Sequence, residues 1–396
     1  MKIDRLDNFG RGITYYNDKI MFVNNALPDE IIDIDNIMEE KKFYVADAIK
    51  IDNENINRIV PKCPYYKDCG GCNIMHMNLD YQEEFKLNKV KEILKKYANI
   101  DMPIRLIKND KDLFYRNKVT LKVENHKYGY FSNKSHNFIE INSCLLINNV
   151  INEFINGNYI DIIDGEITIR SNYQGLLLIS IYSNQDVKIN YDKLQDNVVG
   201  IVINKKTVYK DNYIYDNIGD MRFKISYDSF FQVNNYMASC IFDILRSNLK
   251  GNNLLDLYCG VGTLGLAVKD NFNAIYGVEK VKNAISNAKD NASLNGIKNT
   301  HYYAGNTNDI IKKLNVKFDT IILDPPRSGL NQETIKQVID ILPKTIAYVS
   351  CDPMTLARDL VLLSDKYKIN KINVLDMFPN TYHVECVVLL ERRKAL

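Results

Sequence analysis

Residues 254–265, Leu-Leu-Asp-Leu-Tyr-Cys-Gly-Val-Gly-Thr-Leu-Gly, join a short apolar run to a glycine-rich turn. Such a turn, placed after a strand and before a helix, is where nucleotide cofactors bind in parallel sheets, because backbone N–H groups at the helix start face the ligand. Gly260, Gly262 and Gly265 complete the pattern G-x-G-x-x-G. The stretch therefore predicts an α/β domain that binds a cofactor carrying a nucleoside.

The chain on either side of this turn alternates short apolar runs with helix-like segments. The expected strands are Leu254–Leu257, Ala274–Val278, Thr320–Leu323, Thr345–Val349 and Val384–Leu390. Strands that alternate with helices form a mainly parallel sheet, with its ligand loops at the carboxyl ends of the strands. The expected class is therefore a multidomain α/β protein whose chemistry lies in the C-terminal part.

Two acidic strand ends narrow the choice of cofactor. Glu279 closes the second expected strand, where it suits the ribose hydroxyls of either a dinucleotide or S-adenosylmethionine. The fourth strand end reads Asp324-Pro325-Pro326-Arg327, and its double proline stiffens the loop that carries the aspartate. D-P-P is common in methyltransferases and is not expected in a hydride-transfer enzyme, so S-adenosylmethionine is favoured.

A cysteine and a glutamate follow at later strand ends. Cys351 precedes Asp352 and Pro353, which suit the N-cap and first turn of a helix. A helix N-terminus favours a thiolate, so we expect a nucleophile of depressed pKa, although the charge of Asp352 opposes this. His383 and Glu385 enter the last strand two residues apart, hence on one face, and Glu385 is a candidate general base.

The N-terminal part has a different texture. Residues 1–55 read as short strands punctuated by glycine and proline, which predicts a small β-barrel that is either a structural cap or an RNA-binding module. Residues 79–97 have a helical period with lysines, Lys86 among them, on a solvent face, and residues 103–235 are rich in strands. Possible RNA contacts of the barrel are Arg11, Tyr15, Tyr16, Lys19 and Phe22.

Composition sets limits on the class of protein. A chain of 396 residues predicts two or three domains, and 46% hydrophobic with 25% charged residues is ordinary for a globular protein. Its 51 basic and 49 acidic residues give a net charge of +2, which excludes a strongly basic nucleic-acid binder but leaves room for a local basic groove. Without a secretory signal or an apolar membrane span, the expected location is the cytoplasm.

Four of the eight cysteines have the spacing of a metal site. Cys63, Cys69 and Cys72 form the pattern C-x5-C-G-G-C, and Cys144 follows Ser135-His136 further along the chain. In a reducing compartment such cysteines more often bind metal than form disulfides. Four thiolates suit zinc and iron–sulfur equally, so spacing leaves the two open.

These motifs together resemble the RNA 5-methyluridine (uracil-C5) methyltransferase family. The resemblance runs nearly end to end, through FFQVN at 230–234, DLYCGVGTLG, DPPR, SCDP with TLARDL, and FPNTYHVE at 378–385. It implies a TRAM (OB-like) RNA-binding barrel at residues 1–57, an iron–sulfur central domain at 58–230, and a Rossmann-like class I methyltransferase domain at 231–396. Helix 79–97 is then expected to pack on the last domain. The family often has His where this chain has Asn380, which puts one hydrogen bond near the base in doubt.

The resemblance also implies residue roles. Cys351 adds to C6 of uracil, because C5 becomes nucleophilic only in that adduct, and Glu385 removes the C5 proton after methyl transfer. Arg116 and Lys118 are expected to hold the RNA strand, Arg327 to steady a carbonyl or phosphate, and the target base to flip out. Contacts to S-adenosylmethionine are expected from Gln232, Tyr258, Glu279 and Asp324, with Thr263 and Asn306 as weaker candidates; the ligands of a [4Fe-4S] cluster are Cys63, Cys69, Cys72 and Cys144, whereas Cys240, Cys259 and Cys386 serve packing.

The resulting expectation is a cytoplasmic, monomeric enzyme that methylates uridine C5 in 23S ribosomal RNA, since a TRAM module with four cysteines resembles the ribosomal members of the family. Transfer RNA is the second candidate substrate. Two different activities are also compatible with parts of the sequence: methylation of an exocyclic nitrogen through the D-P-P loop, and a non-catalytic role in RNA binding or ribosome assembly. The intact Cys351 argues against the first of these activities, and Cys351 together with Glu385 argues against the second.

Overall fold

The computed structural model describes residues 1–132 and 137–394, so Ser135 and His136 lie outside it. The chain divides into two compact units, which are described one at a time. Unit 1 comprises Met1–Lys89, Tyr130–Ile139 and Phe378–His383. Unit 2 comprises Val90–Gly129, Glu140–Met377 and Val384–Leu396.

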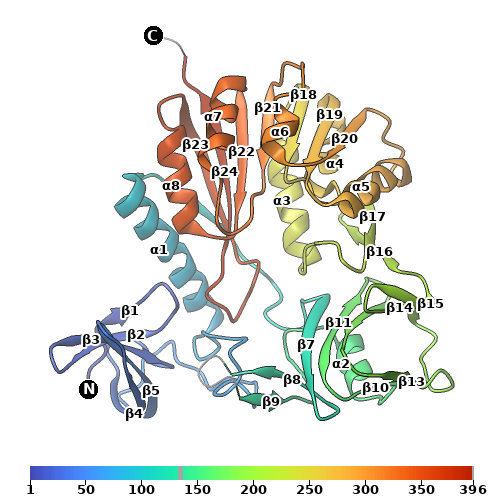
Figure 1. Ribbon diagram of the computed structural model, residues 1–396. Helices are drawn as coiled ribbons and strands as arrows, with labels where there is room; N and C mark the ends of the chain where they lie inside the picture. The colour runs from blue at the N-terminus through green and yellow to red at the C-terminus, as the bar shows by residue number, and fades with distance from the viewer. Residues whose placement is uncertain (133–136, 395–396) are drawn as a thin grey trace. The chain divides into compact units, whose positions relative to one another are not determined.

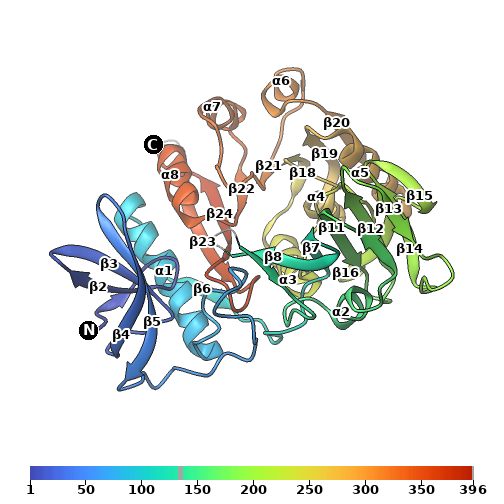
Figure 2. The ribbon, with the colours of Figure 1, turned by 60° about the horizontal axis from the view of Figure 1, so that its bottom comes forward.

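A five-stranded sheet makes up the first half of unit 1 (Figure 2, blue). Its order is β1-β2-β3-β5-β4, and its strands are β1 (Arg5–Leu6), β2 (Gly12–Tyr16), β3 (Lys19–Asn24), β4 (Ile31–Glu39) and β5 (Phe43–Asp52). The first six residues reach both edges of the sheet. They include the edge strand β1, which pairs with β2, and Lys2, which forms a bridge to Ile31 of the other edge strand, β4. Met21, Val23 and Ala46 belong to the apolar core of this sheet, so the sheet has an interior of its own.

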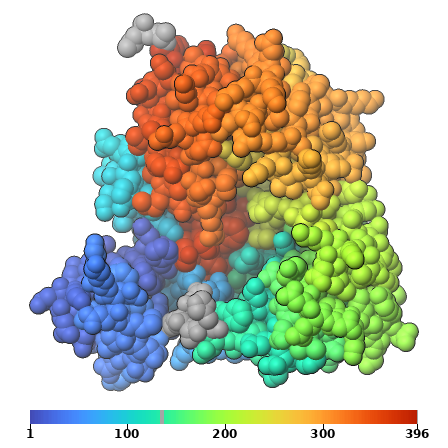
Figure 3. All heavy atoms as spheres, in the orientation of Figure 1, coloured from blue at the N-terminus to red at the C-terminus, as the bar shows by residue number. Residues whose placement is uncertain are grey.

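Helix α1 (Leu79–Ala98) is divided between the two units after Lys89. In unit 2, Val90, Ile93 and Leu94 belong to the main apolar core, while Lys91, Lys95 and Lys96 are exposed. Part of the helix is visible on the surface in Figure 3, in cyan. The period predicted this arrangement for the second half of the helix. It was wrong for Lys86, which is fully buried.

The middle of the chain forms mainly antiparallel structure, in which β12 and β14 are the parallel pair. One sheet has the order β15-β14-β12-β11-β7, continued by β8 and β9. Two ribbons, β10 with β13 and β16 with β17, and the helix α2 accompany it. The bounds are β7 (Lys118–Glu124), β8 (Lys127–Phe131), β9 (Phe138–Glu140), α2 (Asn149–Ile155), β10 (Ile160–Ile162), β11 (Gly165–Ser171), β12 (Leu177–Tyr182), β13 (Val187–Ile189), β14 (Val198–Ile203), β15 (Lys206–Lys210), β16 (Tyr213–Ile218) and β17 (Met221–Ser226).

An eight-stranded sheet of order β20-β19-β18-β21-β22-β24-β23-β6 dominates unit 2 (Figure 1). Its strands are β6 (Ile104–Ile107), β18 (Gly251–Leu257), β19 (Phe272–Glu279), β20 (Thr300–Ala304), β21 (Thr320–Leu323), β22 (Thr345–Ser350), β23 (Tyr367–Leu375) and β24 (Glu385–Arg392). The run from β20 to β22 is parallel, whereas β24 is antiparallel to both its neighbours. The mainly parallel sheet predicted from the alternation is therefore confirmed.

Helices cover both faces of this sheet. One face packs against α1, α6, α7 and α8, whose apolar residues share a core with alternate residues of the strands, and α4 contacts β18 and β19 beside α3. The helices begin at polar caps, such as Asn331 of α7, whose side chain accepts from Thr334 N–H at 2.8 Å. The bounds are α3 (Asn235–Asn248), α4 (Thr263–Ala267), a 3₁₀ turn (Lys269–Asn271), α5 (Lys282–Leu294), α6 (Thr307–Ile311), α7 (Gln332–Ile341) and α8 (Pro353–Leu363).

The five strands expected around the glycine turn are all present, and Thr320–Leu323 has the expected bounds. The pattern did not indicate β6, β20 or β23. Within the described residues, no helix is both long enough and apolar enough to cross a membrane.

Candidate active site

Three sequence-predicted residues meet at the carboxyl edge of the large sheet because their strands are in register. Leu257 lies opposite Val278 of β19 and opposite Leu323 of β21. Tyr258, Glu279 and Asp324 occupy the next position of their respective strands, so the register brings them to one edge. This is the edge at which open parallel sheets bind ligands.

The glycine turn has the backbone of a cofactor cradle. Tyr258 (φ 63°) and Gly260 (φ 54°) adopt left-handed conformations, and the turn ends at Thr263, the first residue of α4. A Cβ added to Gly260 would meet no described atom within 4 Å, so the backbone there faces open space. Glu279 accepts from Gly260 N–H at 3.3 Å and from Val281 N–H at 2.9 Å, which orients its carboxylate beside that space.

A second carboxylate anchors the turn from below. Asp256 is 1% exposed and accepts from Gly265 N–H at 2.9 Å, while its other side-chain oxygen has no hydrogen-bond partner among the described residues. Burial raises the pKa of Asp256 to about 8 and that of Asp324 to about 7. The buried Asp256, the partly buried Asp324 and the oriented Glu279 suit a cationic nucleoside, since a positive charge would offset the burial of these acids.

Two further expected cofactor contacts, Gln232 and Asn306, already have hydrogen-bond partners within the protein. Gln232 is 9% exposed, and its backbone oxygen accepts from the Asn117 side chain at 3.0 Å. Asn306 caps α6, and its side-chain oxygen accepts from Asn308 N–H at 3.0 Å. The side-chain oxygen of Asn306 is therefore already used within the turn, whereas Gln232 contributes only its backbone oxygen to that contact.

Cys351 and Glu385 lie next to each other because of strand pairing. Ser350, the last residue of β22, is opposite Cys386 of the antiparallel strand β24. Cys351, which follows Ser350, is therefore next to Glu385, which precedes Cys386. Asp352 caps α8 as predicted, since its side chain accepts from Thr355 N–H at 2.9 Å. A thiol and a carboxyl group are thus placed side by side at the start of a helix.

The expectation of a depressed thiol pKa was wrong. Burial and the neighbouring Glu385 carboxylate raise the pKa of Cys351 to about 11, and Arg327, which hydrogen-bonds to the thiol, opposes this rise. Burial also raises the pKa of Glu385 well above its usual range, and Arg327 again opposes the shift. Arg327 is therefore the cation that favours ionisation of both groups, a role that the sequence did not indicate.

The segment before Glu385 differs from the prediction. Strand β24 begins at Glu385, so strand alternation does not pair that residue with His383, which belongs to unit 1. Within unit 1 the segment 378–383 is held by α1: Lys86 donates to Phe378 O at 2.9 Å. Asn380 (φ 66°) forms two hydrogen bonds with the Gln82 amide, at 2.8 and 3.2 Å, which accounts for an asparagine at this position.

The four cysteines that were expected to bind a cluster do not all belong to the same unit. Cys63, Cys69 and Cys72 belong to unit 1, Cys144 belongs to unit 2, and all four are partly exposed. No three Cys, His, Asp or Glu side chains within residues 1–132 and 137–394 converge on a metal-binding position.

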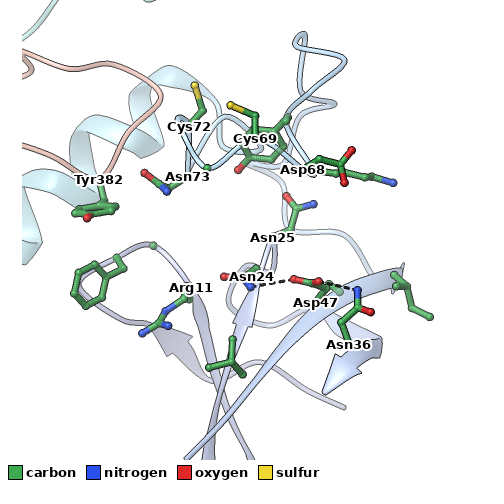
Figure 4. Close-up of a pocket in the computed structure, with 18 of the residues that line it drawn as sticks. Arg11, Asn24, Asn25, Asn36, Asp47, Asp68, Cys69, Cys72, Asn73 and Tyr382 are labelled. Atoms are coloured by element: carbon green, nitrogen blue, oxygen red, sulfur yellow. Dashed lines mark hydrogen bonds between the residues drawn. The ribbon is translucent and has the colours of Figure 1, made fainter. Parts of the chain in front are cut away.

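A cavity of about 700 Å³ lies within unit 1 between the five-stranded sheet and the cysteine segment. Figure 4 shows Asn24, Asp47 and Asn36 on one side, joined by hydrogen bonds of 3.0 Å, with Cys69 and Cys72 on the other. Of the five predicted RNA contacts of the barrel, Arg11 lines this cavity, with its guanidinium 4.4 Å from the ring centre of Phe22; the cavity lining does not include Tyr15, Tyr16, Lys19 or Phe22.

A group of cations lies on strands β7 and β11 of unit 2. Lys118 of β7 is directly opposite Arg170 of β11, and Arg116 is near Lys118. Burial, with Arg170 and Arg116, lowers the pKa of Lys118 to about 8, and burial lowers that of Arg170 to about 10. Arg170 Nη1 and Arg116 Nε have no hydrogen-bond partner among the described residues. The group is thus suited to bind an anion.

Comparisons with known proteins agree with this architecture. The structure superposes on the crystal structure of a Pyrococcus abyssi tRNA (uracil-54, C5)-methyltransferase in complex with S-adenosyl-L-homocysteine, with a TM-score of 0.81, 25% identity, and coverage of 98% of this chain and 99% of that one. An uncharacterized RNA methyltransferase of Clostridium acetobutylicum is 33% identical over 98% of this chain and 96% of its own length. A Streptococcus pneumoniae relative described in the same words is 32% identical, over 99% and 98%.

The fold is that of an S-adenosylmethionine-dependent methyltransferase. A family model for tRNA (uracil-5-)-methyltransferase matches residues 158–393. The chain belongs to this family of RNA uracil-C5 methyltransferases.

Proposed function

We propose that the protein methylates C5 of a uridine in 23S ribosomal RNA, with Cys351 as the nucleophile and Glu385 as the base. The observation that carries this proposal is the pairing of Ser350 with Cys386, which places the thiol and the carboxyl group side by side at the sheet edge. Arg327 interacts with both. A nucleophile, a base and a cation in contact are the set that addition to an activated ring requires.

The thiol begins the reaction. Cys351 loses its proton to water, its sulfur bonds to C6 of uracil, and the electron pair of the C5–C6 double bond moves toward the C4 oxygen. When bound, S-adenosylmethionine supplies an electrophilic methyl group, and we assign its contacts to Gln232, Tyr258, Glu279, Asp324, Thr263 and Asn306. Burial disfavours the thiolate, so Arg327 has to offset part of that cost.

The carboxyl group of Glu385 completes the reaction. After methyl transfer C5 carries both a hydrogen and a methyl group, and Glu385 accepts the C5 proton. The electron pair of the C5–H bond then re-forms the double bond, and the bond from C6 to the Cys351 sulfur breaks. Glu385 has to be a carboxylate before this step, a form that Arg327 favours, and because burial raises its pKa it is a stronger base than an exposed glutamate.

Two classes of RNA are candidate substrates for this reaction. Ribosomal RNA is favoured by the resemblance of the N-terminal part and the four cysteines. Transfer RNA is the second candidate, because the superposed P. abyssi enzyme acts on tRNA by its name and aligns over 98% of this chain, residues of the N-terminal sheet included. The N-terminal sheet therefore does not separate the two substrates.

We also assign RNA contacts to both units. In unit 2 the partly exposed Arg116 and Lys118 supply positive charge, which suits a phosphate of the RNA strand. In unit 1 the amide-rich cavity beside Arg11 suits unpaired bases, so we interpret the five-stranded sheet as a TRAM-type RNA-binding barrel. Its domain would span residues 1–57, followed by a central domain at 58–230 and the catalytic domain at 231–396, in a cytoplasmic monomer.

The [4Fe-4S] cluster remains a proposal supported by the cysteine spacing alone. Iron, acid-labile sulfide and zinc should be measured on protein purified without oxygen, and again on a Cys144→Ser variant. About four irons per chain in the parent and fewer than two in the variant would support the cluster. Zinc in place of iron would replace it with a structural zinc site.

The function is tested with labelled S-adenosylmethionine and unmodified 23S rRNA or tRNA, followed by mapping of the methylated base. We expect label at C5 of a uridine in 23S rRNA, and none with Cys351→Ala. The matched control is Cys240→Ala, which removes another partly exposed cysteine away from the sheet edge. Label in tRNA alone would reassign the substrate, and activity that survives Cys351→Ala would exclude the covalent route.

A further inference from the structure

The sequence TLARDL, Thr355 to Leu360, forms part of helix α8 directly after the proposed nucleophile. Thr355, Arg358 and Asp359 stand at positions i, i+3 and i+4, which share one side of a helix. All three contact a turn that belongs to a different loop, residues 327–330 after strand β21. The reaction proposed above uses none of these three side chains.

Two of the side chains hold carbonyl groups of the turn. Thr355 Oγ1 donates to Arg327 O at 3.1 Å. Arg358 Nη2 donates to Ser328 O and to Leu330 O, each at 3.0 Å. The backbone is therefore fastened to α8 at Arg327 itself and on the C-terminal side of it.

The third side chain is a buried carboxylate with several donors. Asp359 is fully buried and accepts from Leu330 N–H at 2.8 Å and from the Tyr348 hydroxyl at 2.6 Å. Arg358 pairs with its other oxygen at 2.7 Å. A carboxylate in this position is stable only while these partners are present, so it specifies one arrangement of helix, strand β22 and turn.

The turn passes so close to α8 that it requires glycine. Gly329 has φ +72°, and a Cβ added there would lie 2.5 Å from Arg358 Nη2 and 2.7 Å from Asp359 Oδ2. Both the left-handed backbone and the missing side chain are therefore needed at this position. Gly329 N–H also donates to Pro326 O at 2.8 Å, which tightens the turn.

We propose that Thr355, Arg358 and Asp359 are positioning residues that hold the 327–330 turn against α8 and thereby keep the Arg327 guanidinium in contact with the Cys351 thiol. Helix α8 then has two functions: its N-terminus follows the nucleophile, and its side chains place the cation that acts on that nucleophile. The relevance of this arrangement to methyl transfer rests on the proposed function, but the arrangement itself can be tested on the resting protein.

The test is the rate at which iodoacetamide alkylates Cys351 as a function of pH, measured by mass spectrometry of the peptide that contains it. The protein is used alone, without RNA or cofactor. Arg327→Met removes the cation, and Arg358→Met removes its support. We expect each to slow alkylation of Cys351 at pH 8 by about three- to tenfold, because below the thiol pKa the rate follows the thiolate fraction. Alkylation of Cys240 in the same samples is the internal reference.

Matched variants separate positioning from general damage. Arg246→Met removes an arginine that likewise binds a backbone carbonyl, Ala267 O at 2.6 Å, and an acid, Asp220 at 2.7 Å, but lies on α3. It should leave Cys351 alkylation unchanged. Thr355→Val should slow alkylation, whereas Thr355→Ser, which keeps the hydroxyl, should restore the parent rate.

The double variant Arg327→Met/Arg358→Met decides the proposal. If Arg358 acts through Arg327, the double variant alkylates no more slowly than Arg327→Met alone. Independent, multiplicative losses, or an Arg358→Met rate equal to the parent rate, would overturn the proposal. Both outcomes are read without methyl transfer, so a failure to methylate any RNA would contradict the proposed function and leave this result standing.

Discussion

The carboxyl edge of the large sheet and the cysteine segment of residues 63–72 are both built from sequence motifs, yet their assembly differs. At the sheet edge, strand register alone brings Tyr258, Glu279 and Asp324 together, and the pairing of Ser350 with Cys386 completes the site. The cysteines stand on loops, and the described residues form no metal-binding group from them.

The difference shows which sites a fold assembles on its own. Side chains at the ends of paired strands are placed by backbone hydrogen bonds that form whether or not a ligand is bound. Ligands on loops are placed by the ligand as much as by the chain, because binding and local folding are coupled. Activity at the sheet edge should therefore be sensitive to small changes in single side chains, whereas the conformation of the cysteine segment should depend on whether a metal is bound.

The largest effect is expected from Glu385→Gln. The amide keeps the size of the side chain but is a far weaker proton acceptor, so turnover should fall by about 10²–10⁴-fold. Because addition and methyl transfer precede the lost step, a methylated covalent complex with RNA should accumulate. Denaturing gels and mass spectrometry of the complex check this. Unchanged turnover would remove Glu385 from the role of base.

A comparable effect, on stability, is expected from Glu30→Ala in unit 1. The Glu30 side chain is fully buried and pairs with Arg58 at 2.5 Å, so its removal leaves a buried arginine without its partner. The free energy of unfolding should fall by about 3–5 kcal/mol in denaturant titrations. Glu39→Ala breaks the exposed Lys19–Glu39 pair of the same sheet and should change little. Equal effects of the two variants would contradict the structural role of the buried Glu30–Arg58 pair.

The formation of the covalent complex should depend strongly on pH. Burial raises the pKa of Cys351 to about 11, so at neutral pH the thiol is protonated and the thiolate fraction grows about tenfold per pH unit. Single-turnover rates should therefore rise by roughly 100-fold between pH 7 and pH 9. A rate that is constant over this range would show that the thiol is already ionised and that its environment differs from the one described.

A smaller effect is expected on RNA binding. Lys118→Met removes one cation of the group with Arg116 and Arg170, and should weaken RNA binding by about three- to tenfold at low salt and reduce the salt dependence by about one ion. Lys122→Met, further along the same strand, removes a lysine already paired with Glu166 at 2.5 Å and is the control. Filter binding over a salt series measures both. Equal losses would indicate non-specific charge attraction.

The sequence predicted most of the site because its motifs coincide with strand ends. Thr320–Leu323 is apolar throughout its last three residues and bounded by Asp324-Pro325, so that strand was placed without error. The strand β20 was missed because its residues, Thr-His-Tyr-Tyr-Ala, are mostly polar or aromatic and only one of them is buried. β6 was missed because four residues far upstream in the chain join the sheet only through β23.

The remaining errors concern environments that arise only in three dimensions. Lys86 was expected in solvent, yet its ammonium group donates a hydrogen bond to the carbonyl oxygen of Phe378, nearly 300 positions away in the sequence. The pKa of Cys351 was expected to be low from the helix N-terminus, but burial and Glu385 outweigh that effect. The contact of Arg327 with the Cys351 thiol was also not predictable, since nothing in the motif DPPR indicates where the arginine side chain lies.

The most direct test of the covalent mechanism is the reaction with an RNA substrate that carries 5-fluorouridine at the target position, in the presence of S-adenosylmethionine. Because fluorine replaces the C5 hydrogen, the base has no proton to remove, and the covalent adduct should persist after methyl transfer. We predict a complex stable to denaturation that contains RNA, one methyl group and the peptide of Cys351. A substrate that is methylated with no covalent complex, or a complex formed by Cys351→Ala, would contradict the mechanism.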